Sequence, residues 1–207
     1  MRGDCMDPDG DIITNRFSKL LSDKLNAKEI NIALGGGSNE RTLRTTYEWI
    51  RKNSEKVEST LFIIGFTFQI RKDLYFDVTK EWIRWSGRTV SALGDGDVKT
   101  FIGFEKEVDK WSDTQYKYFY NDDIEAEKLY RDFELLKTYI ESKKSKLIVF
   151  NALRPGTKLD DRLTWYKPGG FKDWKTFIHS YREYDGSHPL VEDNQKLTED
   201  FWSYLNE

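Results

Sequence analysis

Residues 61–67 are Leu61-Phe62-Ile63-Ile64-Gly65-Phe66-Thr67. Four apolar residues in succession predict a strand that is covered on both faces, because a strand with one face in water alternates apolar and polar residues. Such strands are typical of parallel sheets flanked by helices. This stretch therefore predicts an α/β fold, in which Gly65-Phe66-Thr67 lies at the end of a buried strand.

Upstream of this strand, residues 28–34 predict a second strand, Lys28-Glu29-Ile30-Asn31-Ile32-Ala33-Leu34. It leads directly into a glycine-rich turn, Gly35-Gly36-Gly37-Ser38-Asn39. A helix is expected over residues 40–52, with Ser38 or Asn39 as its N-cap. Apolar residues at helical spacing predict an earlier helix over residues 15–26.

Downstream, an amphipathic pattern predicts a long helix over residues 122–142. Residues 146–152 predict another buried strand, built around Leu147-Ile148-Val149-Phe150. A final helix is expected from about residue 191 to residue 205. This alternation predicts a three-layer α/β/α protein with a parallel sheet and helices on both faces. Ligands of such sheets bind beyond the carboxyl ends of the strands.

Residues 71–120 are rich in aromatic and charged side chains, with glycines at 87, 94, 96 and 103. We expect irregular structure and short helices here, forming a cap or lid. No repeat or linker divides the sequence, so residues 1–207 are predicted to form one domain.

Composition excludes several classes of function. The net charge is −3 and no basic stripe occurs, which argues against nucleic acid as a partner. No apolar run approaches the roughly 18 residues of a membrane span, so no membrane partner is expected. The single cysteine rules out a disulfide within the chain and favours a reducing compartment, the cytoplasm. Two separated histidines and one cysteine predict no metal site.

The chain has two histidines, His179 and His188. His188 follows Asp185 by three residues and directly precedes Pro189, which disfavours helix at His188 and predicts a loop. A carboxylate at this spacing can orient the imidazole and stabilise its charged form when it accepts a proton. Asp185 and His188 are therefore candidate catalytic residues; the alternative is a surface loop that caps the final helix.

Two turns at strand ends supply candidate substrate-binding groups. Backbone N–H groups of Gly36, Gly37, Ser38 and Asn39 at a helix N-terminus can form part of an oxyanion hole or a phosphate cradle. Gly65 and Thr67 end the next strand, and Thr67 can donate a hydrogen bond to the same pocket. Arg71 can hold an anionic substrate. Each feature has an alternative interpretation without a binding role. Gly35–Asn39 can be a tight turn that needs glycine, Gly65–Thr67 can be a strand end without function, and Arg71 can form a surface salt bridge.

Taken in order, these blocks resemble the SGNH (GDSL-type) hydrolases. In that family a nucleophilic Ser follows the first strand, oxyanion donors follow the second and third, and a late Asp-x-x-His completes a triad. Gly35–Asn39 matches the second block, Gly65-Phe66-Thr67 the third, and Asp185–His188 the last. The combination of Gly-Gly-Ser-Asn with Arg-Thr-Thr, and of Ile-Gly-Phe-Thr with Arg71, is similar to small SGNH-like proteins of tailed phages. The resemblance then implies a location in the host cytoplasm.

The sequence departs from the family pattern at two places. Thr67 stands where the family has Asn, which alters one oxyanion donor. The nucleophile has two interpretations: Gly3-Asp4-Cys5 is the nucleophile block with Cys5 as the attacking group, or the block and its strand lie upstream of this chain. We favour the second, because few residues precede Cys5 and a chain end is usually frayed. This second interpretation predicts that the chain by itself has little esterase activity.

The resemblance implies an esterase or acyl-transfer hydrolase that acts on a small-molecule or glycan ester by a Ser/Cys–His–Asp mechanism. His188 is the expected general base and Asp185 orients it; no dissociable cofactor is needed. One alternative is a non-catalytic binding protein with the same fold and no competent nucleophile. Another is a nucleotide- or sugar-phosphate-handling protein that uses the Gly35–Gly37 turn. Aromatic residues near Trp82, Trp85, Trp111 and Tyr116–Tyr120 can line a carbohydrate or lipid site, or pack a core or lid.

Overall fold

The fold was analysed in a computed structural model of the 207-residue chain. The structure describes residues 15–33, 37–67, 71–77, 80–86, 89–92, 105–152, 166–171, 173–181 and 190–207. Two compact units are present: residues 36–166 form one, and residues 1–35 with 167–207 form the other. We call them the central unit and the terminal unit.

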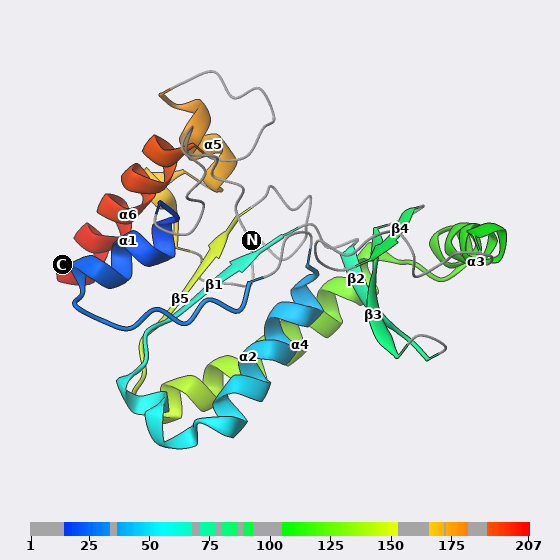
Figure 1. The fold of residues 1–207 in the computed structure, drawn as a ribbon, viewed down its shortest axis with the longest axis horizontal. Helices are drawn as coiled ribbons and strands as arrows, with labels where there is room; N and C mark the ends of the chain where they lie inside the picture. Colours follow the sequence, from blue (N-terminus) through cyan, green and yellow to red (C-terminus); the bar gives the residue numbers. More distant parts are fainter. Residues whose placement is uncertain are drawn as a thin grey trace. The chain divides into compact units, whose positions relative to one another are not determined.

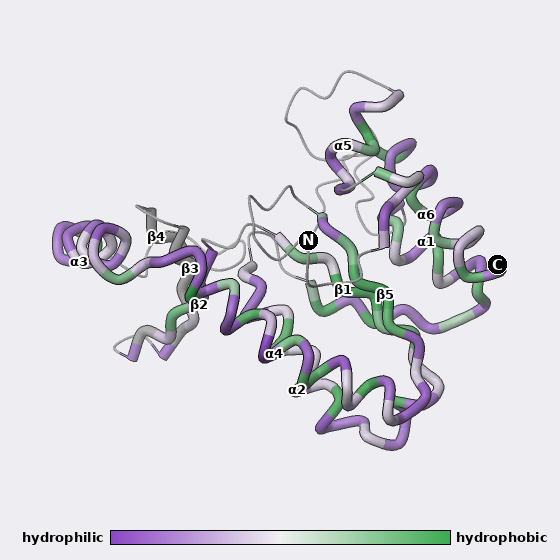
Figure 2. Tube along the Cα trace, turned by 180° about the vertical axis from the view of Figure 1, so that it is seen from behind, coloured by the Kyte–Doolittle hydropathy of each residue, from purple (hydrophilic) through white to green (hydrophobic). Residues whose placement is uncertain are grey.

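The central unit contains a parallel pair of strands, β1 (Phe62–Phe66) and β5 (Leu147–Asn151), which lie side by side in Figure 1. Phe62 is opposite Leu147, and Phe66 is opposite Asn151. Tyr166 adds a parallel bridge to Phe150. Both strands are coloured as hydrophobic in Figure 2. The prediction of two buried strands at these positions is confirmed, and the chain is an α/β protein in this respect.

Helices α2 (Asn39–Lys52) and α4 (Asp122–Ser142) pack on this strand pair and on each other (Figure 1). Alternate residues of β1, Phe62, Ile64 and Phe66, are buried in the same core as the apolar stripe of α4. The Phe66 and Phe133 rings meet edge to face at 5.5 Å. Burying one such side chain contributes about 1.5–3 kcal/mol, so this core stabilises the central unit. A short 3₁₀ helix, η1 (Ser54–Ser59), joins α2 to β1.

Residues 71–120 contain more regular structure than expected. They form an antiparallel meander of β2 (Arg71–Phe76), β3 (Glu81–Ser86) and β4 (Thr89–Ala92), followed by the 14-residue helix α3 (Glu105–Tyr118). The expectation of irregular structure with short helices is therefore wrong for these stretches. Glycines and charged residues suggested irregular structure, but the aromatic and β-branched residues of 81–86 favour a strand. Whether the segment acts as a lid stays a prediction.

The terminal unit is helical in the residues that the structure describes. Helix α1 (Phe17–Lys24) lies against α6 (Val191–Asn206), and α5 (Trp174–His179) and the short 3₁₀ helix η3 (Pro168–Gly170) complete the unit (Figure 1). Phe17 stacks on Phe201 at 5.6 Å and meets Trp174 edge to face at 5.7 Å. The helices expected over 15–26 and 191–205 are confirmed within about two residues at each end, the usual uncertainty of a helix boundary.

The strand predicted over residues 28–34 is wrong across its described part, residues 28–33, which have no regular structure. Ile30 and Ile32 are 50% and 41% exposed, so this apolar alternation is not buried. Glu29 instead receives two hydrogen bonds from Arg16, at 2.9 and 2.6 Å, and one from Ser18 at 2.5 Å. Burial alone would raise the pKa of Glu29, but these contacts outweigh it and lower that pKa. The segment is held to α1 by this ion pair.

No helix within the described ranges combines the length and the apolar character that crossing a membrane requires.

Candidate functional site

The expected site lies at the carboxyl ends of β1 and β5. Because the two strands are parallel, Phe66 and Asn151 end them at the same edge of the sheet, where Ala152 N–H donates to the Phe66 carbonyl at 2.9 Å. Thr67 follows β1 directly, and Gly37-Ser38-Asn39 leads into α2. The structure thus brings together two sequence blocks about 28 residues apart, as shown by the Asn39–Thr67 contacts.

A pair of buried hydrogen bonds joins these blocks. The Asn39 amide donates to the Thr67 carbonyl at 3.0 Å, and the Thr67 N–H donates to Asn39 Oδ1 at 2.7 Å. Asn39 is 5% exposed and Thr67 is 9% exposed. The Asn39 side chain therefore satisfies both the N–H and the carbonyl of Thr67, the residue after β1, as a neighbouring strand would. This contact fixes the start of α2 to the end of β1.

Ser38 is fully buried and caps α2. Its hydroxyl accepts the Arg41 N–H at 3.0 Å, the contact expected of an N-cap residue. The prediction that Ser38 or Asn39 caps this helix is confirmed for Ser38, which is committed to the helix end.

We expect Ser38→Ala to lower the free energy of unfolding by about 0.5–2 kcal/mol with only a moderate effect on any ester turnover, because a cap is lost and no attacking group is removed. Urea unfolding checks this, with Ser142→Ala as the matched control, since Ser142 is an exposed helix-end serine. That control is expected to change stability by at most about 0.5 kcal/mol. Covalent labelling of Ser38 by a fluorophosphonate probe would contradict its structural role.

Gly65 is required by close packing. A Cβ at this position would lie 2.8 Å from Phe150 Cζ and 3.3 Å from Ala152 Cβ. A side chain here would displace the Phe150 ring, which belongs to the neighbouring strand β5. The packing accounts for glycine at this position independently of any oxyanion contact.

Arg71, the first residue of β2, donates from Nη1 to Thr67 Oγ1 at 2.9 Å. The structure therefore places Arg71 beside the end of β1, where the resemblance puts substrate. The Thr67 hydroxyl oxygen is thus the acceptor of a hydrogen bond from the Arg71 guanidinium. Of the predicted binding residues, Ser38, Asn39, Thr67 and Arg71 form one connected group.

A second polar group, which sequence analysis did not find, adjoins Arg71 on β2. Asp73 has a side chain only 2% exposed, with Arg44 Nη2 at 3.3 Å and Arg41 Nη1 at 4.0 Å from its Oδ2. The Arg44 guanidinium also lies 3.7 Å from the ring centroid of Trp82 on β3. The sequence holds no signal for this group, because it arises only when α2 packs on β2.

Lys72 on β2 forms ion pairs with residues of α2 and α4. Its ammonium bonds Glu40 on α2 at 2.8 Å and also bonds Glu125 on α4. Burial acts to raise the pKa of Glu125, but hydrogen bonds and charge from Lys72 and Lys128 outweigh it and lower that pKa. Glu125 is therefore held as a carboxylate, and it orients Lys72 rather than serving as a proton donor.

At the end of β5, Asn151 is 4% exposed and its Oδ1 has no hydrogen-bond partner among the described residues. An acceptor left unpaired in a buried position is costly, and it lies at the edge where the sheet is expected to bind ligands. Sequence analysis placed ligands beyond the carboxyl ends of such strands without selecting this residue.

The three predicted catalytic residues, Cys5, Asp185 and His188, lie outside the described residues, as does Gly36. Their assignment stays a prediction. Among the residues that are described, no group of three or more His, Cys, Asp or Glu side chains is placed to share a metal ion.

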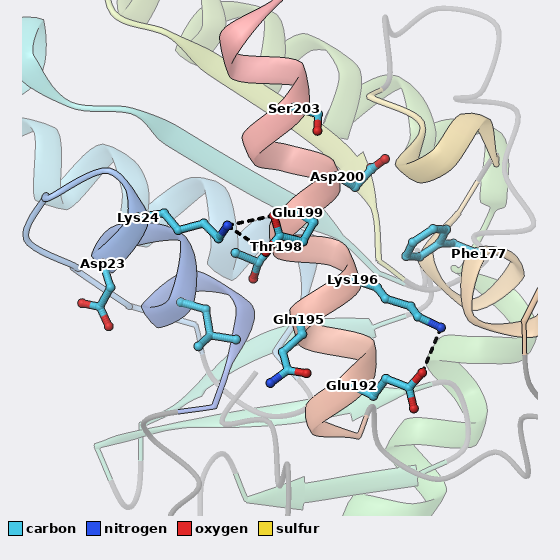
Figure 3. A pocket seen from close by; sticks show the side chains of 11 residues that line it. Asp23, Lys24, Phe177, Glu192, Gln195, Lys196, Thr198, Glu199, Asp200 and Ser203 are labelled. Atoms are coloured by element: carbon cyan, nitrogen blue, oxygen red, sulfur yellow. Dashed lines mark hydrogen bonds and ion pairs between the residues drawn. The ribbon is translucent and has the colours of Figure 1, made fainter.

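A surface hollow of about 870 Å³ is present in the terminal unit, between side chains of α1, α5 and α6 (Figure 3). Lys24 reaches from α1 to Glu199 at 2.7 Å, and Lys196 pairs with Glu192 at 2.9 Å. Both lysines are thus neutralised by glutamates of α6, so the hollow offers no unbalanced cation to an anionic ligand. None of the predicted site residues that the structure describes lines it.

Comparison with known proteins gives one family match. A family model described as "Family of unknown function (DUF6071)" matches residues 13–205. No curated protein and no solved structure matches.

Proposed function

The chain belongs to the DUF6071 family of unknown function, and we propose that it is an ester hydrolase or acyl-transfer enzyme of the SGNH type. The observation that carries the proposal is the buried Asn39–Thr67 contact. It joins the two sequence blocks that the resemblance assigns to the oxyanion region, at the edge of the sheet where α/β proteins bind ligands. The proposal implies a three-layer α/β/α fold that includes the β1–β5 pair.

In this proposal His188 is the general base and Asp185 orients its ring and stabilises the imidazolium. The mechanism requires no dissociable cofactor. The expected reaction is attack of a Ser or Cys nucleophile on an ester carbonyl, followed by hydrolysis or transfer of the acyl group.

The contacts at the site restrict which groups can act as oxyanion donors. The Thr67 N–H already donates to Asn39 Oδ1, which removes one of the donors that the resemblance assigns to the oxyanion region. We therefore assign oxyanion stabilisation to the backbone N–H groups of Gly36 and Gly37 at the start of α2, where the helix dipole favours negative charge. Thr67 and Asn39 then hold this turn in place.

A non-catalytic binding protein is the second candidate, and the same contacts favour it. The Thr67 N–H, a donor that a hydrolase of this type would direct at an oxyanion, is used here to hold α2 to β1. In that case the protein would retain a ligand at the sheet edge without turning it over.

The two candidates are separated by turnover of short-chain p-nitrophenyl esters together with labelling by a fluorophosphonate probe and by iodoacetamide. The enzyme is expected to hydrolyse the esters and to lose activity with one of the two reagents. Absence of both turnover and labelling would reject a hydrolase that carries its nucleophile in this chain and would favour the binding protein.

Cys5 is expected not to be the nucleophile. Cys5→Ala should retain the ester turnover of the unmodified protein within about twofold, because the favoured interpretation of the sequence assigns the attacking group to a residue other than Cys5. The measurement is kcat/KM for p-nitrophenyl butyrate before and after iodoacetamide treatment. Loss of turnover in both the variant and the alkylated protein would make Cys5 the attacking group.

A further inference from the structure

One face of the β2–β3 hairpin carries exposed aromatic rings next to buried charge. Arg71, Asp73 and Tyr75 alternate along β2 and so share a face of the strand. Trp82 on β3 is the cross-strand partner of Tyr75, and the two rings meet at 5.5 Å with an interplanar angle of 66°. We call Tyr75 and Trp82, with Arg44 beside them, the aromatic face.

The Trp82 ring is held in place by a planar cation. Arg44 lies 3.7 Å from the ring centroid, and its other contacts are Asp73 at 3.3 Å and Glu48 at 3.9 Å. Asp73 is buried, so it provides a fixed anchor for the guanidinium. A ring supported in this way loses little conformational entropy when it binds a ligand, which favours binding.

The rings nevertheless stay in contact with water. Tyr75 is 50% exposed and Trp82 is 38% exposed, while the Arg44 side chain is 29% exposed. Flat apolar rings beside planar hydrogen-bond donors match carbohydrate, whose ring C–H groups pack on aromatic faces while its hydroxyls accept hydrogen bonds from guanidinium. A purely apolar ligand would instead leave Arg44 and its partners without water, at considerable cost.

We propose that the aromatic face binds a glycan chain, and that the ester acted on by this protein is a substituent of that glycan. The second part rests on the proposed function. Arg71, at the start of β2, contacts Thr67 at the end of β1. From Arg71 to Tyr75 is four residues along a strand, about 13 Å, so the aromatic face lies within reach of a chain whose ester is bound at Thr67.

The test is binding of the full chain to an array of neutral and acidic oligosaccharides, followed by calorimetric titration with the best binder. His188→Ala is used throughout, so that turnover does not consume the ligand. Trp82→Ala and Tyr75→Ala in this background are each expected to weaken binding about tenfold, because aromatic side chains often contribute much of the binding energy at an interface. Tyr139→Ala is the matched control, because Tyr139 is also 38% exposed and lies near the end of α4. It should bind as tightly as the parent.

Two results would overturn the proposal: no binding to any oligosaccharide on the array, or binding that neither aromatic substitution weakens. If Trp82→Ala alters the oligomeric state while no glycan binds, the face belongs to a second copy of the chain and the proposal fails. Circular dichroism of each variant confirms folding, and Tyr75→Ala leaves the Arg44–Trp82 contact in place. Glycan binding without ester turnover would reject the hydrolase and retain the aromatic face as a binding surface. Turnover of small esters without glycan binding would retain the hydrolase and reject the aromatic face as a glycan-binding surface.

Discussion

Replacement of His188 by alanine is expected, in a chain that carries its nucleophile and turns over short-chain esters, to lower kcat/KM by roughly 10³–10⁶-fold, the range seen when members of a catalytic triad are removed. The general base removes a proton from the nucleophile and later donates it to the leaving group, so its loss affects both proton transfers. The loss should appear mainly in kcat, since the imidazole acts in the transition state and contributes little to binding the ester.

His179→Ala is the matched control, because His179 and His188 are the two histidines of the chain. His179 ends helix α5 of the terminal unit, and its removal should leave kcat/KM within about threefold of the parent. Near-normal turnover by His188→Ala would reject the assignment of Asp185 and His188 as base and orienting carboxylate. Equal losses in both variants would point to misfolding, which circular dichroism detects.

Asn39→Ala is expected to reduce the free energy of unfolding of the central unit by about 2–5 kcal/mol. The substitution removes two buried hydrogen bonds, at 3.0 and 2.7 Å, and leaves the N–H and carbonyl of Thr67 unsatisfied. Each buried group that loses its partner costs about 1–3 kcal/mol. Urea unfolding, monitored by far-ultraviolet circular dichroism, measures the change.

Asn206→Ala is the control, because the Asn206 amide donates to the Trp202 carbonyl at an exposed helix end. It should cost at most about 0.5 kcal/mol. Asn39→Asp keeps the acceptor for the Thr67 N–H and loses the donor to its carbonyl, so an intermediate loss is expected. A loss below about 1 kcal/mol in Asn39→Ala would show that the contact does not hold α2 to β1.

Segments with a strong local pattern were predicted well from sequence. The helix over 122–142 has the predicted bounds, because Asn121 caps its start and its apolar stripe is continuous. The strands at 62–66 and 147–151 were likewise recognised, since long apolar β-branched runs favour burial in a sheet. Residue type and position narrowed the N-cap of α2 to Ser38 or Asn39, and the structure shows that it is Ser38.

Prediction failed where the partner of a segment decides its structure. Residues 28–33 have an apolar alternation suited to a strand, but Arg16 and Ser18 bind Glu29 and the isoleucines stay exposed. Residues 71–76 and 81–86 are charged and aromatic, and they become strands by pairing with each other. A strand is stabilised by hydrogen bonds to a neighbour, so its own sequence specifies it only weakly.

For this protein, then, sequence by itself determined the helices with a strong local pattern, the two buried strands and the residue types available at their ends. Only tertiary structure decided how those residues are used. Asn39 binds Thr67, and Asp73 anchors Arg44 against Trp82, because α2 packs on both β1 and β2. Local patterns report the preferences of a few consecutive residues, whereas these contacts join residues about 28 and 29 positions apart. They form only when the hydrophobic core brings the helix onto the strands.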